Sequence, residues 1–153
     1  MSIATGQRLL PVAHPAIDHT TLTLAAGLLI AASTHLTLAV EHGASTFAVL
    51  AAIAGGAQAV LAVIAMRGGA RSIAQAAMVL SLVLIQLYAL NVTVGLPPVI
   101  AHTHTVGTHV VLGLTLAWPN PIDGQGLVAQ FAQAVAVVCA VALQRGAVRR
   151  GSI

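Results

Sequence analysis

The sequence is poor in charge, in aromatic residues and in cysteine, and the shortage of charge excludes whole classes of protein. Of its 153 residues only 6% are charged, whereas 58% are hydrophobic. Soluble domains carry about a quarter charged residues, so this chain has too few polar groups to cover a water-exposed globular surface. A soluble enzyme, a nucleic-acid-binding protein and a disordered tail are therefore excluded, and helices embedded in a lipid bilayer remain.

Other absences argue against chemistry of the chain's own. The single cysteine, Cys139, lies in an apolar run and has no second cysteine with which to form an intramolecular disulfide. No lysine or acidic residue lies within the long apolar runs, where proton- and ion-coupled transporters usually place one. The sequence also lacks an external Ser/His/Asp set, paired carboxylates and a phosphate-binding loop. These absences favour a protein without catalytic activity of its own.

Long apolar runs are what the chain has instead, and they predict an all-α membrane protein built as a bundle of four transmembrane helices. A helix needs about 20 apolar residues to cross about 30 Å of hydrocarbon. An N-terminal segment (1–20) and a basic tail (146–153) flank a membrane domain at 21–145. Within it, the predicted spans cover about residues 21–40, 44–66, 73–96 and 127–143.

The placement of arginine predicts the orientation of these spans. All six basic residues are arginines, in residues 1–20, in the turn 67–71 and after residue 144. Because arginine-rich connections stay in the cytoplasm, we expect a multi-pass plasma-membrane protein with both termini cytoplasmic. Glu41 and Asp123 then lie on the outer side.

The connection before the last span contains an apolar stretch, residues 106–118, that is only about 13 residues long. It is too short to cross the bilayer and too apolar for a free loop. We predict a short interfacial or re-entrant helix that ends at Trp118. The alternative is an ordered loop packed over the bundle.

Close packing and polar contacts are expected to hold the spans together, because lipid provides little hydrophobic drive between helices. Ala51, Gly55 and Ala59 recur at intervals of four and would let another helix approach closely. Side-chain amides cost free energy in hydrocarbon unless they are hydrogen-bonded. We therefore expect the amides within the spans to point into the bundle or at a partner subunit; they are Gln58, Gln86, Asn91, Gln130 and Gln133.

Histidine is abundant, with seven residues against three acids. Neutral imidazole binds copper, zinc and nickel. In an extended segment His102 and His104 would project to one side, roughly 6 to 7 Å apart, which suits two ligands on one ion. We predict a metal site, copper ahead of zinc because no thiolate lies outside. Its candidate ligands are expected at the outer membrane face: His35, Glu41, His42, His102, His104 and His109.

Less specific interpretations of these histidines stay open. An interfacial histidine can be there for its amphipathic character, and a histidine within a span can simply hydrogen-bond to a neighbouring helix. Haem held by two histidines is disfavoured, because only His35 lies inside a span.

Several short features lie along the chain: His35, the Glu41–His42 pair, the arginine turn 67–71, Thr93–Pro97, and His102 with His104. In these features the chain resembles small four-span membrane proteins of unknown function that are common in high-GC Gram-positive bacteria. The resemblance covers most of residues 20–145 and implies the same layout, but it implies no activity. Such relatives tend to carry more acids in the outer loop, where this chain has only Asp123.

Two functions follow from these observations as hypotheses. The first is a small accessory or structural subunit of a larger membrane complex, with a copper-dependent membrane monooxygenase as one conceivable host. The second is a stand-alone protein that binds or delivers copper or zinc through the outer histidines. The lipid bilayer is the expected partner in both.

Overall fold

The protein is mostly helical, and the computed structural model describes residues 18–98, 107–117 and 119–150. The described residues contain three helical stretches long and apolar enough to cross a membrane: His19–Glu41, Thr46–Thr93 and Gly124–Gly146. A mostly helical fold that is compatible with a membrane is therefore confirmed. The elements are α1 (His19–Glu41), α2 (Thr46–Ile64), the π-helical turn η1 (Ala65–Gly69), α3 (Ala70–Thr93), β1 (Thr108–Val111), β2 (Leu114–Ala117) and α4 (Gly124–Arg150).

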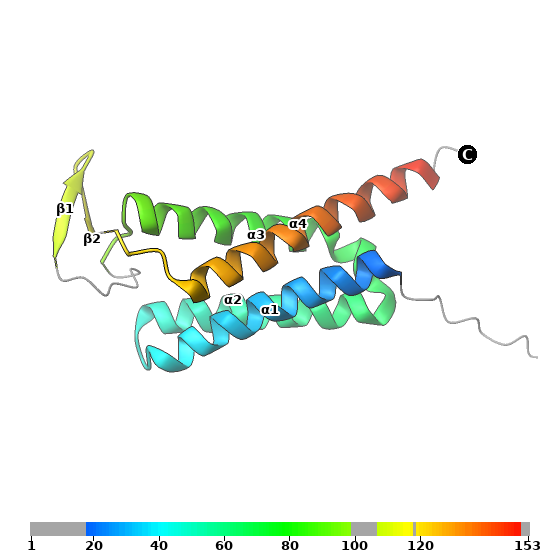
Figure 1. Ribbon diagram of the computed structural model, residues 1–153, viewed down its shortest axis with the longest axis horizontal. Coiled ribbons are helices and arrows are strands. Elements are labelled where there is room, and N and C mark those ends of the chain that lie inside the picture. Colours follow the sequence, from blue (N-terminus) through cyan, green and yellow to red (C-terminus); the bar gives the residue numbers. More distant parts are fainter. Residues whose placement is uncertain (1–17, 99–106, 118, 151–153) are drawn as a thin grey trace, which may run out of the picture.

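The longest of these stretches is bent back on itself at η1. Gly68 there has φ 92° and ψ 1°, a left-handed conformation that glycine adopts without the steric cost of a side chain. Because of this break, α2 and α3 run in opposite directions (Figure 1). The Arg67–Arg71 segment thus reverses the chain, as its glycines predicted, at a break in the helical backbone.

Polar side chains mark where the helices begin. The Asp18 carboxylate accepts a hydrogen bond of 2.7 Å from the Thr21 N–H ahead of α1, and Asp123 accepts one from the Gly126 N–H in the first turn of α4. The Ser45 hydroxyl accepts from the Ala48 N–H at 3.0 Å ahead of α2. Each cap satisfies a backbone donor that the helix itself leaves without a partner. Two of the chain's three acids therefore have structural roles.

Glycine sets the closest approaches between helices. α1 packs against both α2 and α4, and α4 packs against α3. A Cβ added at Gly27 would lie 2.9 Å from the Ala132 carbonyl oxygen of α4, and one at Gly55 would lie 2.9 Å from the Ala32 carbonyl oxygen of α1. Gly55 therefore lies at the α1–α2 contact, within the row of small residues that was expected to admit a neighbouring helix.

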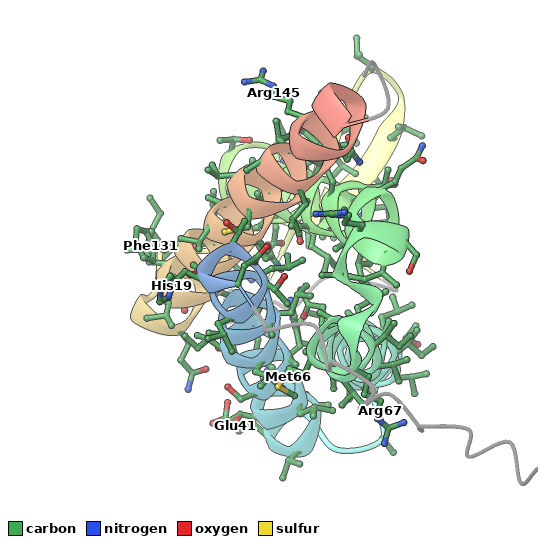
Figure 2. The ribbon with its side chains drawn as sticks, turned by 90° about the vertical axis from the view of Figure 1, so that its right-hand side faces the viewer. His19, Glu41, Met66, Arg67, Phe131 and Arg145 are labelled. Carbon is green, nitrogen blue, oxygen red and sulfur yellow. The ribbon has the colours of Figure 1, made fainter. Side chains whose placement is uncertain are left out.

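Large apolar side chains cover the outer faces of the helices. Ile53 is 63% exposed and Phe131 is 74% exposed. Figure 2 shows Phe131 projecting away from α4. Exposed apolar surface of this kind is compatible with contact between the helices and the lipid chains of a bilayer.

The prediction of a short helix over residues 106–118 is wrong for the described part of that stretch. β1 and β2 form an antiparallel hairpin with Thr108 opposite Ala117 and Val111 opposite Leu114. The two residues between the strands, Leu112 and Gly113, have φ 51° and 80°, as the hairpin turn with two left-handed residues requires. Threonine and valine favour strands because their branched side chains fit a pleated surface, so this composition was compatible with a hairpin.

The hairpin is fastened to the end of α3. The Ala117 N–H donates to the Leu96 carbonyl oxygen at 2.9 Å, and the Asn120 N–H donates to the Asn91 carbonyl oxygen at 3.1 Å. Gly95, with φ 91°, lies so close that a Cβ there would collide with the Ala117 carbonyl oxygen. The alternative of an ordered segment packed over the helix ends is therefore the better description of residues 107–117.

The two ends of the molecule differ in where the described arginines lie. η1, the start of α1 and the last turns of α4 lie at one end, called the arginine end below, which carries Arg67 and Arg145 pointing away from the helices (Figures 1 and 2). The turn after Glu41 and the hairpin with His109 lie at the other end (Figure 1). This second end is called the hairpin end below.

Candidate functional site

The histidines nearest the end of α1 have separate local partners. His42 caps α1: its Nδ1–H donates to the Leu38 carbonyl oxygen at 2.7 Å. Its ring also meets the Phe47 ring edge-on, with 5.1 Å between the ring centres and 70° between the planes. Glu41 beside it is exposed. These contacts give His42 a structural role in the turn between α1 and α2.

His35 joins α1 to α4 inside the molecule. The Gln133 amide Nε2 lies 3.0 Å from His35 Nε2, so the amide donates to the imidazole. Gln133 has no solvent exposure and His35 is partly buried. In an apolar surrounding, two polar groups that hydrogen-bond to each other across helices cost less free energy than two polar groups without partners. Gln133 therefore points into the helix packing, as its position in an apolar run predicted.

The predicted metal ligands do not meet in the described part of the chain. No group of three His, Cys, Asp or Glu side chains close enough to hold one ion occurs among residues 18–98, 107–117 and 119–150. His109 is half-buried on β1 beside Gly95. His102 and His104 lie outside the described residues. Metal binding by the outer histidines therefore stays a prediction.

A cavity of about 160 Å³ opens between the helices near the hairpin end. α1, α2, α3 and α4 all contribute walls, and half of the lining residues are leucine, valine or alanine. Six residues of α1, α3, α4 and the segment before α4 supply the polar part of the lining: His35, Tyr88, Asn91, Asn120, Asp123 and Gln130. We call this space, with its lining, the hairpin-end cavity.

Two of these polar side chains have buried atoms without a hydrogen-bond partner. Among the described residues, nothing pairs with Asn91 Oδ1 or Gln130 Oε1. Leaving such an atom unsatisfied costs about 1–3 kcal/mol. Two such atoms around one cavity mark a place where hydrogen bonds to something else would stabilise the protein.

Polar atoms without partners continue further into the helix packing. Gln58 and Ser81 are fully buried, and within the described ranges neither side chain has a hydrogen-bond partner. Gln58 follows the cavity-lining Ala54 by four residues on α2, and Ser81 precedes the cavity-lining Leu84 by three on α3. At these spacings they share the cavity-lining faces, one turn deeper. These two polar groups therefore lie beyond the cavity lining, deeper in the helix packing.

The remaining predicted amide lies elsewhere. Gln86 is exposed on α3, next to the exposed Leu82, Val83 and Leu87. Its amide points away from the helix packing. Such amides were expected to point either into the bundle or at a partner subunit, and for Gln86 the structure excludes the first.

Sequence reasoning did not single out Tyr88 as a cavity residue. The hydroxyl of Tyr88 is buried, and its ring fits against Gly126, where a Cβ would collide with it. The signal in the sequence is the spacing of Ser81, Tyr88 and Asn91, which places three polar groups on one helical face.

No family model matches the chain, and no curated protein and no solved structure matches it either. The function must therefore be inferred from the side chains themselves, and the exposed Gln86 and the hairpin-end cavity are the features from which to infer it.

Proposed function

We propose that the chain is an integral membrane protein with four crossings that serves as an accessory subunit of a larger membrane complex. In this proposal α1, α2, α3 and α4 each cross the bilayer, because the reversal at Gly68 lets the long stretch Thr46–Thr93 cross twice. The grouping of Arg67, Arg71 and Arg145 away from the hairpin supports a cytoplasmic location for that end and for both termini.

The orientation is tested by labelling cysteine variants in sealed cells. A membrane-impermeant maleimide is expected to label Glu41→Cys and to leave Arg145→Cys unlabelled until the cells are opened. The native Cys139 is buried and serves as the unlabelled background. Labelling of Arg145→Cys in intact cells would contradict the proposed orientation, because it would place this end of the protein outside the cell.

The exposed amide of Gln86 is the observation that carries the subunit proposal. It lies well inside α3, seven residues before its last residue, among large apolar side chains that are also exposed. Lipid chains offer neither donors nor acceptors, so an amide that faces them loses its hydrogen bonds. A helix of another subunit packed on this face would restore them. Polar contacts of this kind between membrane helices are worth about 0.6–2 kcal/mol.

Gln75 provides a matched control on the same helix. It is also exposed, and its separation of 11 residues from Gln86 is close to three full turns, so both lie on one face of α3. Gln75 is near the arginine end, where headgroups and water can solvate its amide. A change to leucine is therefore expected to weaken the association with a partner subunit at Gln86 and to leave it unchanged at Gln75.

The experiment is purification of the tagged protein from its own membranes in mild detergent. We expect a partner in fixed stoichiometry, and we expect Gln86→Leu to weaken the association about 3- to 30-fold, while Gln75→Leu leaves it unchanged. A wild-type protein that purifies alone, or a Gln86→Leu variant that keeps its partner in full, would contradict the proposal.

A further inference from the structure

The hairpin-end cavity points to a binding function that does not depend on a partner subunit. We propose that it binds one uncharged, ring-sized molecule, or the ring-sized head of a lipid-soluble molecule, that carries a hydroxyl group able to donate a hydrogen bond. Phenols and hydroquinones are the chemical class that meets this description.

The volume sets the size of the ligand. The cavity measures about 160 Å³. A cavity of about 150 Å³ in an apolar protein core takes up one benzene ring. The hairpin-end cavity therefore has room for one six-membered ring with small substituents, and a longer chain on such a ring would have to extend out of it.

The lining sets the charge of the ligand. In the part of the chain that the structure describes, the one charged residue at the cavity is Asp123, which is exposed and already accepts from the Gly126 N–H. The other walls are apolar or carry neutral polar groups. Because an ion pays a large desolvation penalty in such a place, the cavity selects a neutral molecule.

The buried polar atoms set the hydrogen-bonding character. Asn91 Oδ1 and Gln130 Oε1 are acceptors, and the described residues supply no donor to either of them. The Tyr88 hydroxyl lies against the backbone of Asp123, whose N–H can donate to it, so its own O–H is left to donate to a ligand. A ligand hydroxyl satisfies this set, because it can donate to an amide oxygen and accept from the tyrosine at the same time. An ether or a hydrocarbon of the same size cannot donate.

Two close approaches hold these groups in place. The Tyr88 ring is fixed against Gly126 of α4, where there is no room for a Cβ. The Asn91 backbone carbonyl accepts from the Asn120 N–H at 3.1 Å, which ties this part of α3 to the segment after the hairpin. A site whose polar groups are held before binding loses less conformational entropy when the ligand enters.

The test compares two small probes on the purified protein in phospholipid nanodiscs. 4-Fluorophenol carries the hydroxyl, and 4-fluoroanisole replaces it with a methyl ether that accepts but does not donate. Titrations followed by fluorine NMR are expected to show saturable binding of 4-fluorophenol and at least about tenfold weaker binding of 4-fluoroanisole, the effect of one buried hydrogen bond.

Variants locate the site. Asn91→Leu and Gln130→Leu each remove an acceptor while keeping similar bulk. Because 4-fluorophenol has one O–H to donate, the variant that lacks the acceptor it uses is expected to bind about tenfold more weakly. Gln75→Leu makes the same kind of change outside the cavity and is expected to bind as the wild type does. Circular dichroism shows whether each variant is still helical.

Three results would overturn the proposal. One is uptake of 4-fluorophenol that does not saturate and equals that of protein-free nanodiscs. A second is equal affinity for the two probes, a comparison on the wild-type protein that does not depend on the folding of any variant. The third is wild-type affinity in both folded cavity variants. None of these results bears on the partner of Gln86, because the isolated protein is used.

Discussion

The two halves of the helix packing are built in different ways. Toward η1, the interior is a continuous cluster of small and medium apolar side chains in which Ala65, Ala74 and Ala140 have no exposure and Leu24 and Leu28 fill the remaining space. Toward the hairpin, the same four helices enclose a cavity with unsatisfied polar atoms. We call these the alanine half and the cavity half. The difference indicates that one half supplies stability and the other keeps room for a ligand.

The largest expected effect comes from adding the same side chain to each half. Ala74→Leu has no space in the alanine half, and overpacking of this kind costs up to about 3 kcal/mol. Ala54→Leu would extend into the cavity and is expected to change the unfolding free energy by less than about 1 kcal/mol. Unfolding in mixed detergent micelles measures both, and helix propensity cancels because alanine is replaced by leucine in each.

Equal losses of stability in the two variants would contradict the division into halves. A loss confined to Ala54→Leu would reverse it.

A smaller and more local effect is expected where the hairpin is fastened to α3. Gly95→Ala strains a left-handed backbone position and pushes against the Ala117 carbonyl. Gly113→Ala imposes the same kind of strain at the hairpin tip, where nothing lies within 4 Å of the added Cβ. Both variants have this backbone strain, which costs about 1–2 kcal/mol. Only Gly95→Ala also collides with Ala117, so only this variant should break the hydrogen bond from the Ala117 N–H to the Leu96 carbonyl oxygen.

Amide hydrogen exchange at Ala117 distinguishes the two glycine variants. Exchange should be faster in Gly95→Ala than in Gly113→Ala, with the amides of the alanine half unchanged in both. If both variants exchange alike at Ala117, the close approach at Gly95 does not hold the hairpin.

The smallest effect on stability is expected for the predicted metal ligands. The double variant His102→Ala/His104→Ala should keep the wild-type unfolding midpoint in metal-free buffer and lose the bound copper or zinc, as measured by elemental analysis after dialysis. His19→Ala, at the arginine end, serves as the control. If the double variant keeps its metal content, these two histidines form no site, and the hairpin end has the cavity as its one candidate site among the residues described.

Much of the helical fold could be predicted from the sequence because each helix is encoded locally. The helices α1, α2, α3 and α4 coincide with the long apolar runs of the sequence. The arginine segment with its glycines marks the reversal between α2 and α3. The hairpin could not be predicted in the same way. Its turn uses Leu112 ahead of Gly113, and leucine gives no signal for a left-handed position.

The cavity could be predicted even less, because it depends on how the helices are placed relative to one another. Gln130 on α4 and Asn91 on α3 can both be recognised in the sequence as amides within apolar runs. Only the packing of α4 against α3 brings the two to one cavity. The sequence also led us to expect each inward-pointing amide to be hydrogen-bonded. Gln133 meets that expectation with its Nε2, which donates to His35, but not with its Oε1, and Gln58 has no such partner within the described chain.

The reversal at Gly68 also bears on how the protein is made. With helical backbone up to Ile64 and again from Ala70, five residues separate the two arms, so α2 and α3 form a tight helical hairpin. In the proposed orientation, such a hairpin favours insertion of α2 and α3 as a pair, with Arg67 and Arg71 keeping the bend on the cytoplasmic side. A cytoplasmic protease would meet no extended chain at this point, so the pair is also protected from being cut apart after insertion.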